Sequence, residues 1–83
     1  MNVKIHPHAD ERARERGTTH EEIIATVLLG EHFPAKQGRM GFRRTVIFNS
    51  VWQDKHYYAK QLECYAIEEN NEWIVISVVV KYF

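Results

Sequence analysis

The sequence predicts an α+β domain in which two N-terminal helices pack on one face of a three- to four-stranded antiparallel sheet. Two observations predict this class. Apolar residues follow a helical spacing up to Gly30 and alternate in the manner of strands after it. The segments after Gly30 are also rich in β-branched and aromatic residues and are separated by turn-forming residues. A chain of 83 residues fits one domain, and we expect residues 1–83 to form it.

Both helices carry start and stop signals. Pro7 suits the first position of a helix, and Gly17 is well placed to end it. Thr18 and Thr19 each begin a capping box, so a second helix is expected from there to Gly30. The apolar residues with helical spacing inside it are Ile23, Ile24, Val27 and Leu28.

Strands are predicted over residues 42–49, 60–69 and 72–83, with Asn70 and Asn71 forming a tight hairpin turn because Asn tolerates positive φ. Residues 36–41 are predicted to form a turn, and 49–59 a long connection. Simple alternation divides the last strand into two faces. One face holds Ile74, Ile76, Val78 and Val80, and the other holds Trp73, Val75, Ser77, Val79 and Lys81.

Two short helices can cover only one face of such a sheet. The other face must stay open, dimerise or hold a ligand, and alternation assigns Arg43, Thr45, Ser77 and Lys81 to it. An exposed patch containing Trp73, Val75 and Val79 would be unusual for a monomer. A homodimer, or a sheet covered by a partner, is therefore expected.

Charge is balanced overall, with eleven Lys and Arg against eleven Asp and Glu, but it is not evenly distributed. In residues 32–62 cations alternate with aromatic rings, and Asp54 is the only acid. Such a mixture suits phosphates and unpaired bases, so single-stranded RNA is the predicted ligand. The residues expected to bind it are Lys36, Arg39, Arg44, Trp52, Lys55 and Tyr58. The alternative is that these cations are solvated and the rings belong to the core.

Other patterns narrow the class of protein. The single Cys64 lies in an apolar run and suits a reducing compartment, and no segment is apolar and long enough for a signal peptide or a membrane span. We therefore expect a cytoplasmic protein with no membrane partner. The five histidines and Cys64 lack metal-ligand spacing, and no Gly-rich phosphate loop or serine nucleophile motif is present. No metal and no cofactor are expected.

The chain opens with His8-Ala9-x-x-Arg12-x-x-Glu15-Arg16-Gly17 and continues with Thr19-x-Glu21-Glu22-Ile23. Later motifs are Phe33-Pro34-Ala35-Lys36, Gly38-Arg39-x-Gly41-Phe42-Arg43, Lys60-Gln61 and the run from Trp73 to Phe83. In these residues the chain resembles a family of small uncharacterised bacterial domains, which is grouped on fold grounds with the RelE-like and barnase-like ribonucleases of toxin–antitoxin systems. Trp52-Gln53-Asp54 with Tyr57 is also similar to the motility quorum-sensing regulator toxin. The resemblance implies a RelE-like fold; ribonuclease activity would follow only by analogy.

RNA cleavage without a metal needs a base, a phosphate clamp and an acid. His8 is the predicted acid or base, because a His side chain can both accept and donate a proton and this one begins a helix, although a His there can also serve only the helix start. Arg43 and Lys60 are the predicted phosphate contacts. The resemblance adds Lys81 or Tyr82, at the end of the last strand, as a catalytic residue, although alternation also allows Tyr82 to be core.

Two functions follow as hypotheses. The first is a toxin-like, metal-independent endoribonuclease that acts on single-stranded or ribosome-bound mRNA and pairs with a small antitoxin protein. The alternative is a non-catalytic RNA-binding or protein-interaction module of a toxin–antitoxin-like system that uses the open sheet face. RelE-like ribonucleases tend to be strongly basic, so the neutral overall charge of this chain counts toward the alternative. The endoribonuclease stays the preferred hypothesis by a narrow margin.

Overall fold

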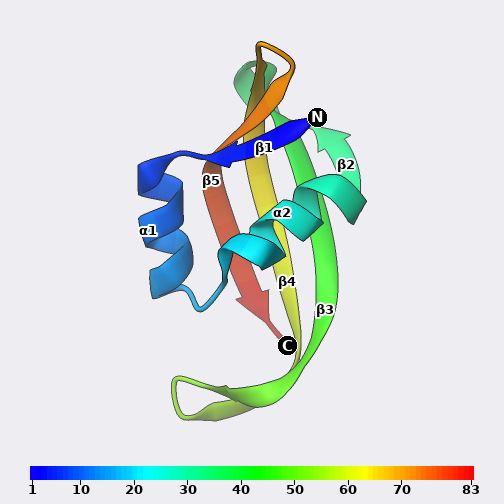
Figure 1. Ribbon diagram of the computed structural model, residues 1–83. Coiled ribbons are helices and arrows are strands. Elements are labelled where there is room, and N and C mark those ends of the chain that lie inside the picture. The colour runs from blue at the N-terminus through cyan, green and yellow to red at the C-terminus, as the bar shows by residue number, and fades with distance from the viewer.

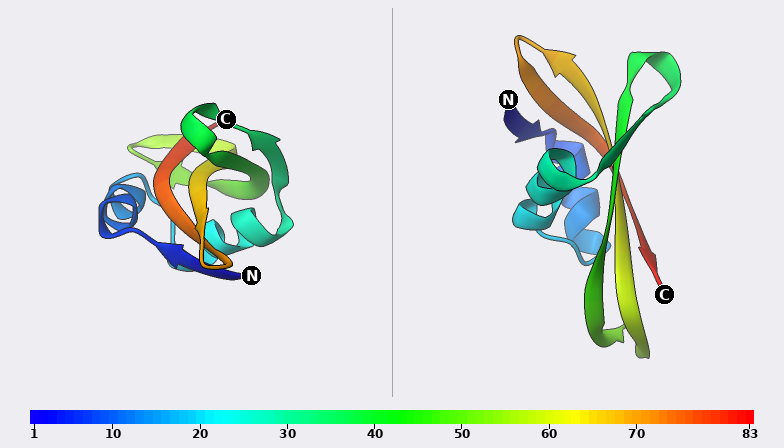
Figure 2. Two further views of the ribbon diagram at one scale, coloured as in Figure 1. Left: turned by 90° about the horizontal axis from the view of Figure 1, so that it is seen from above. Right: turned by 90° about the vertical axis from the view of Figure 1, so that its right-hand side faces the viewer.

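The computed structural model describes residues 1–83 as one twisted five-stranded sheet with two helices on one of its faces (Figures 1 and 2). The predicted α+β class is confirmed. In chain order the elements are β1 (Asn2–Ile5), α1 (Pro7–Glu15), α2 (His20–Leu29), β2 (Glu31–Pro34), a short 3-10 turn (Lys36–Gly38), β3 (Met40–Trp52), β4 (Lys55–Glu69) and β5 (Glu72–Tyr82).

The strands lie in the order β1-β5-β4-β3-β2. β1 runs parallel to β5, and every other neighbouring pair is antiparallel. The predicted three- to four-stranded, purely antiparallel sheet is therefore wrong at both edges. β1 and β2 have four residues each, so each offers only two residues per face, too few for alternation to reveal them.

The helix signals act as predicted. Pro7 occupies the first turn of α1, and Gly17 follows the helix with a φ of 80°. Thr19 caps α2: its hydroxyl accepts from the Glu22 amide, and the Glu22 carboxylate accepts from the Thr19 amide. The α2 helix ends at Gly30.

The hairpins confirm one turn and correct another. Asn70 and Asn71 have φ of 52° and 62°, as expected for the tight turn between β4 and β5. The predicted long connection over 49–59 is instead the end of β3, a two-residue turn at Gln53 and Asp54, and the start of β4. Backbone pairing extends this hairpin beyond the core, so its polar composition is that of an exposed ribbon.

The core lies between the helices and the sheet and contains ten buried apolar residues. They are Ala9, Ala13, Ile23, Val27, Phe42, Leu62, Cys64, Ala66, Val75 and Val78. Val75 and Val78 are both members, which simple alternation does not allow. The register explains this: Tyr65 pairs with Ser77 and Ala66 with Val75, so Ile76 is left without a partner as a β-bulge.

The bulge corrects the predicted faces of β5. Val75 is fully buried among core residues, and the Trp73 ring meets the Phe42 ring edge-on at 5.2 Å between centroids. Neither residue lies on the open face, so the apolar surface from which a homodimer was expected loses two of its three members there. Trp73 is half-buried and instead lines a hollow beside α2 with Leu28 and Met40. Neither helix has the length and apolar character needed to cross a membrane.

Candidate functional site

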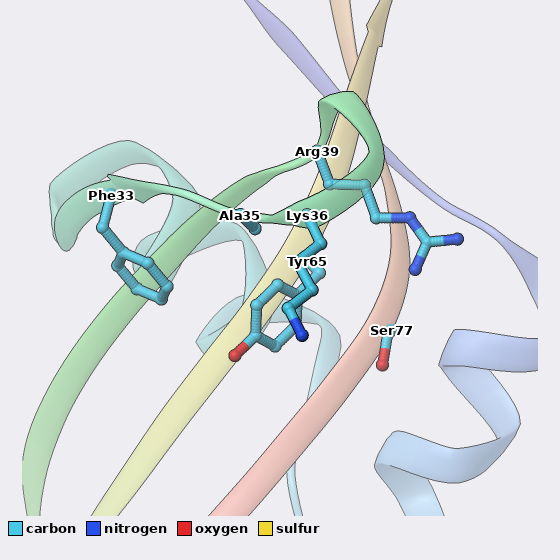
Figure 3. A pocket seen from close by; sticks show the side chains of 6 residues that line it. All are labelled: Phe33, Ala35, Lys36, Arg39, Tyr65 and Ser77. Atoms are coloured by element: carbon cyan, nitrogen blue, oxygen red, sulfur yellow. The ribbon is translucent and has the colours of Figure 1, made fainter.

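The sheet face away from the helices carries a groove of about 440 Å³. Its walls come from β2, the 3-10 turn, β4 and β5 (Figure 3). The lining residues are Phe33, Ala35, Lys36, Arg39, Tyr65 and Ser77. Ser77 is the one lining residue that alternation had assigned to the open face.

Two aromatic rings form the floor of this groove. Gly41 pairs with Phe33 on β2 and with Tyr65 on β4. Because Gly41 has no side chain, the Phe33 ring can lie against it; a Cβ at this position would be 2.4 Å from that ring. The Phe33 and Tyr65 rings meet edge-on, with centroids 6.1 Å apart. Sheet register thus fixes two rings side by side on the open face.

Two cations line the groove beside these rings. The turn that carries them is closed by hydrogen bonds between Ala35 and Arg39 and between Arg39 and Lys36, and Gln37 and Gly38 take positive φ. In Figure 3 the Lys36 side chain lies over Tyr65, and Arg39 reaches across β5 above Ser77. Both cations are exposed and neither forms an ion pair. The groove therefore combines unneutralised positive charge with an aromatic floor.

A second charged group lies beside the groove. The Arg43 Nε donates to the Glu63 carboxylate at 2.8 Å, and the Lys81 ammonium lies 3.8 Å from it. The hydrogen bond from Arg43 to Glu63 raises the pKa of Arg43. The Arg43 guanidinium also lies over the Phe33 ring, 4.5 Å from its centroid. Arg43 and Lys81, both predicted as catalytic, thus lie on the open face, but Glu63 partly neutralises their charge.

Lys60 and Tyr82, also predicted as catalytic, lie on the helix-facing side. Lys60 is buried, with 4% of the residue exposed. Its ammonium lies 2.8 Å from the Glu22 carboxylate and donates to the Gly17 carbonyl at 3.1 Å. The Tyr82 hydroxyl donates to the Arg16 carbonyl at 2.6 Å, and burial raises the pKa of Tyr82. These two residues anchor the connection between α1 and α2 and do not reach the groove.

The remaining predicted RNA-binding residues lie apart from the groove. Trp52 stacks on Tyr82, with centroids 5.2 Å apart. Arg44 pairs with the buried Leu62 and so lies on the helix-facing side of β3. Lys55 and Tyr58 belong to the exposed hairpin of β3 and β4. The fold thus divides the basic and aromatic residues of segment 32–62 among the open face, the helix-facing side and the exposed hairpin.

His8 is exposed on α1, where its ring stacks on His6 with centroids 5.3 Å apart. It lines a smaller groove beside β5 and takes no part in the open-face groove. The structure contains no group of three or more His, Cys, Asp or Glu residues that could hold a metal ion.

Sequence reasoning missed Phe33, Tyr65 and Glu63. Tyr65 and Glu63 could have been found by alternation along 60–69, which places them opposite the apolar positions Leu62 and Cys64. Phe33 offered no signal, because its strand is too short to show a period.

Comparison with known proteins adds no identification: no family model, no curated protein and no solved structure matches this chain. The resemblance to toxin ribonucleases and the RelE-like grouping stay predictions.

Proposed function

We propose that the protein binds single-stranded RNA on the open face of its sheet. The observation that carries this proposal is that two unpaired cations, Lys36 and Arg39, line one groove with the rings of Phe33 and Tyr65. Lys36 lies over Tyr65, and Arg39 lies above Ser77 (Figure 3). The lining of the groove contains no carboxylate.

The two parts of the groove suit the two parts of a nucleotide. Lys and Arg attract phosphates, and Arg can bind two phosphate oxygens with its planar fork. Aromatic rings such as the half-buried Phe33 and Tyr65 can stack on unpaired bases, a contact worth about 1–3 kcal/mol per base. Tyr65 and Ser77 both line the groove and carry hydroxyls that can bond a ribose 2′-hydroxyl, which DNA lacks.

A binding titration with a labelled oligouridylate tests the proposal. Wild type should bind, and the Lys36→Met/Arg39→Gln variant should lose most of the affinity. Lys4→Met is the matched control, because Lys4 is an exposed cation on β1, paired with Glu72 and outside the groove. No binding by wild type at low salt would refute the proposal.

Two comparison ligands separate RNA from other polyanions. An abasic strand of equal length should bind more weakly, because it cannot stack on Phe33 and Tyr65. Polyglutamate should bind more weakly still. If polyglutamate instead binds as tightly as RNA, the groove is better assigned to an acidic protein partner.

RNA cleavage is the second candidate function, and the position of Glu63 favours it. Its carboxylate, with a side chain 10% exposed, is held between Arg43 and Lys81 on the open face. In that position it can accept the proton of a ribose 2′-hydroxyl while the 2′-oxygen attacks the adjacent phosphorus. The bond to the leaving 5′-oxygen then breaks, Lys81 supplies that oxygen with a proton, and a 2′,3′-cyclic phosphate results. Arg43 would stabilise the charge on the phosphoryl oxygens.

Incubation of the purified protein with total RNA, with and without a chelator, tests this candidate. Cyclic phosphate ends should form equally in both samples. Glu63→Gln should lower the rate about 10²–10⁴-fold and leave RNA binding intact. Intact RNA after incubation would leave binding as the only proposed activity. The predicted homodimer, antitoxin partner and cytoplasmic location stay predictions.

A further inference from the structure

A second groove, of about 240 Å³, runs along the edge of β5. Two side chains of α1, from His8 and Arg12, and that of its C-cap residue Arg16 line this groove opposite the bulged part of β5 around Ser77. They are four residues apart, so they lie in one row along the helix.

The end of β1 makes room for this groove. The last backbone bond beside this edge runs from the His6 amide to the Val75 carbonyl. Beyond Val75 the edge of β5 has no neighbouring strand, and α1 lies along it (Figure 1). The Arg16 guanidinium donates to the Val78 carbonyl, which holds the helix against the strand and keeps a cation beside the groove.

The groove is positively charged and its charge is not neutralised. No carboxylate lines it, and Arg12 is exposed and forms no ion pair or side-chain hydrogen bond. The acidic residue of α1 that forms ion pairs, Asp10, contacts Arg14 and His20 instead. Arg12 is therefore open to an external anion.

The two grooves meet at Ser77, which lines both of them. In Figure 3 Arg39 reaches over β5 toward the side on which α1 lies. A ligand bound under Arg39 can thus continue past Ser77 to Arg12, and no carboxylate lines either groove.

We propose that the α1 groove binds a further phosphate of the same RNA strand, which crosses β5 at Ser77. This inference rests on the proposed RNA binding of the open face. In this inference Arg12 contacts a phosphate of the RNA that lies beyond the nucleotides bound over Phe33 and Tyr65. A long strand can reach both grooves, and a very short one can fill only the first.

Oligouridylates of about eight and about three nucleotides distinguish the two grooves. Arg12→Gln should weaken binding of the longer strand about tenfold at low salt, since one charge-assisted phosphate contact is lost, and leave the shorter strand unaffected. The Arg39→Gln variant should weaken both. Arg14→Gln is the matched control, because it removes the same charge from the same helix outside the groove.

The outcomes separate this inference from the proposed function. If wild type binds both strands and Arg12→Gln binds them as wild type does, the second groove is refuted and the first stands. If Arg12→Gln weakens both strands equally, a separate subsite is also refuted. If wild type binds neither strand, the proposed function fails and the inference with it. His8→Gln should also weaken binding of the longer strand alone, by less than Arg12→Gln does. If His8→Gln binds both strands as wild type does, His8 is not part of the subsite.

Discussion

The two faces of the sheet carry the same kinds of side chain in opposite roles. On the helix side, Lys60 is buried against Glu22, and Tyr82 donates to a backbone carbonyl. On the open side, Lys36 is exposed without an anion beside it, and Tyr65 forms the floor of a groove. Residue type alone therefore does not distinguish a residue that holds the fold from one that can bind a ligand. Burial and the partners already present make the difference.

The largest expected effect separates the two lysines. Lys60→Met should lower the free energy of unfolding by about 3 kcal/mol, because it leaves the partly buried Glu22 carboxylate without its cation. Lys36→Met should change it by less than about 0.5 kcal/mol. Urea denaturation followed by circular dichroism measures both. An equal loss of unfolding free energy in the two variants would contradict the assignment of different roles to Lys60 and Lys36.

The two tyrosines give a smaller effect in the same direction. Tyr82→Phe removes the hydrogen bond to the Arg16 carbonyl and should lower the free energy of unfolding by about 1 kcal/mol. Tyr65→Phe should leave it nearly unchanged, since its hydroxyl makes no hydrogen bond within the protein. Thermal and urea unfolding of both variants check this, and a larger loss for Tyr65→Phe would contradict the assignment.

The pH dependence of stability sharpens the role of Glu22. Burial raises the pKa of Glu22, but the hydrogen bonds from Lys60 and Thr19 outweigh burial and hold the pKa below its ordinary value. Because the folded pKa is the lower one, the carboxylate stabilises the fold above the unfolded value of about 4.3, and this contribution is lost as pH falls through the folded pKa.

The measurement is the difference in free energy of unfolding between wild type and Glu22→Gln across this range of pH. The difference should be constant near neutral pH and disappear in acid, where the Glu22 carboxylate of wild type is itself protonated. A difference that persists unchanged in acid would show that Glu22 acts only through packing and neutral hydrogen bonds.

Cys64 tests the helix side without a mutation. It is fully buried, and burial raises the pKa of its thiol to about 12. Native protein at about pH 8 should therefore react with a chromogenic disulfide reagent only as fast as it opens or unfolds. Reaction should be rapid in denaturant. Rapid reaction of the native protein would mean that the helices do not seal this side.

The elements that could be predicted from the sequence are those fixed by residues next to one another in the chain. Pro7, Thr19 and the pair Asn70 and Asn71 act through the backbone beside them, so both helices and the last hairpin could be located. The short strands β1 and β2 could not, because their existence depends on partners distant in the chain. The bulge at Ile76 was equally hidden, and it reversed the faces of Trp73 and Val75.

The candidate site was predictable only in part. The local concentration of cations and rings was visible, and two of its members, Lys36 and Arg39, do line the groove. The sequence did not show that other predicted residues lie away from the groove, because that depends on tertiary packing, which buries Lys60 and stacks Trp52 on Tyr82. Tyr65 could have been found by alternation along β4. Arg12 was visible only as part of the opening motif, and its groove became visible only when the topology set α1 beside the free edge of β5.

The salt dependence of RNA binding tests the central claim most directly. Each phosphate contact to a single strand contributes about −0.7 to the slope of log K against log salt. Relative to wild type, Lys36→Met/Arg39→Gln should reduce the magnitude of this slope by about 1.4, which is two contacts of about 0.7 each. Lys60→Met, measured where it is folded, should leave the slope unchanged. An unchanged slope in the first variant, or an equal reduction in the second, would contradict the assignment of RNA binding to the open face.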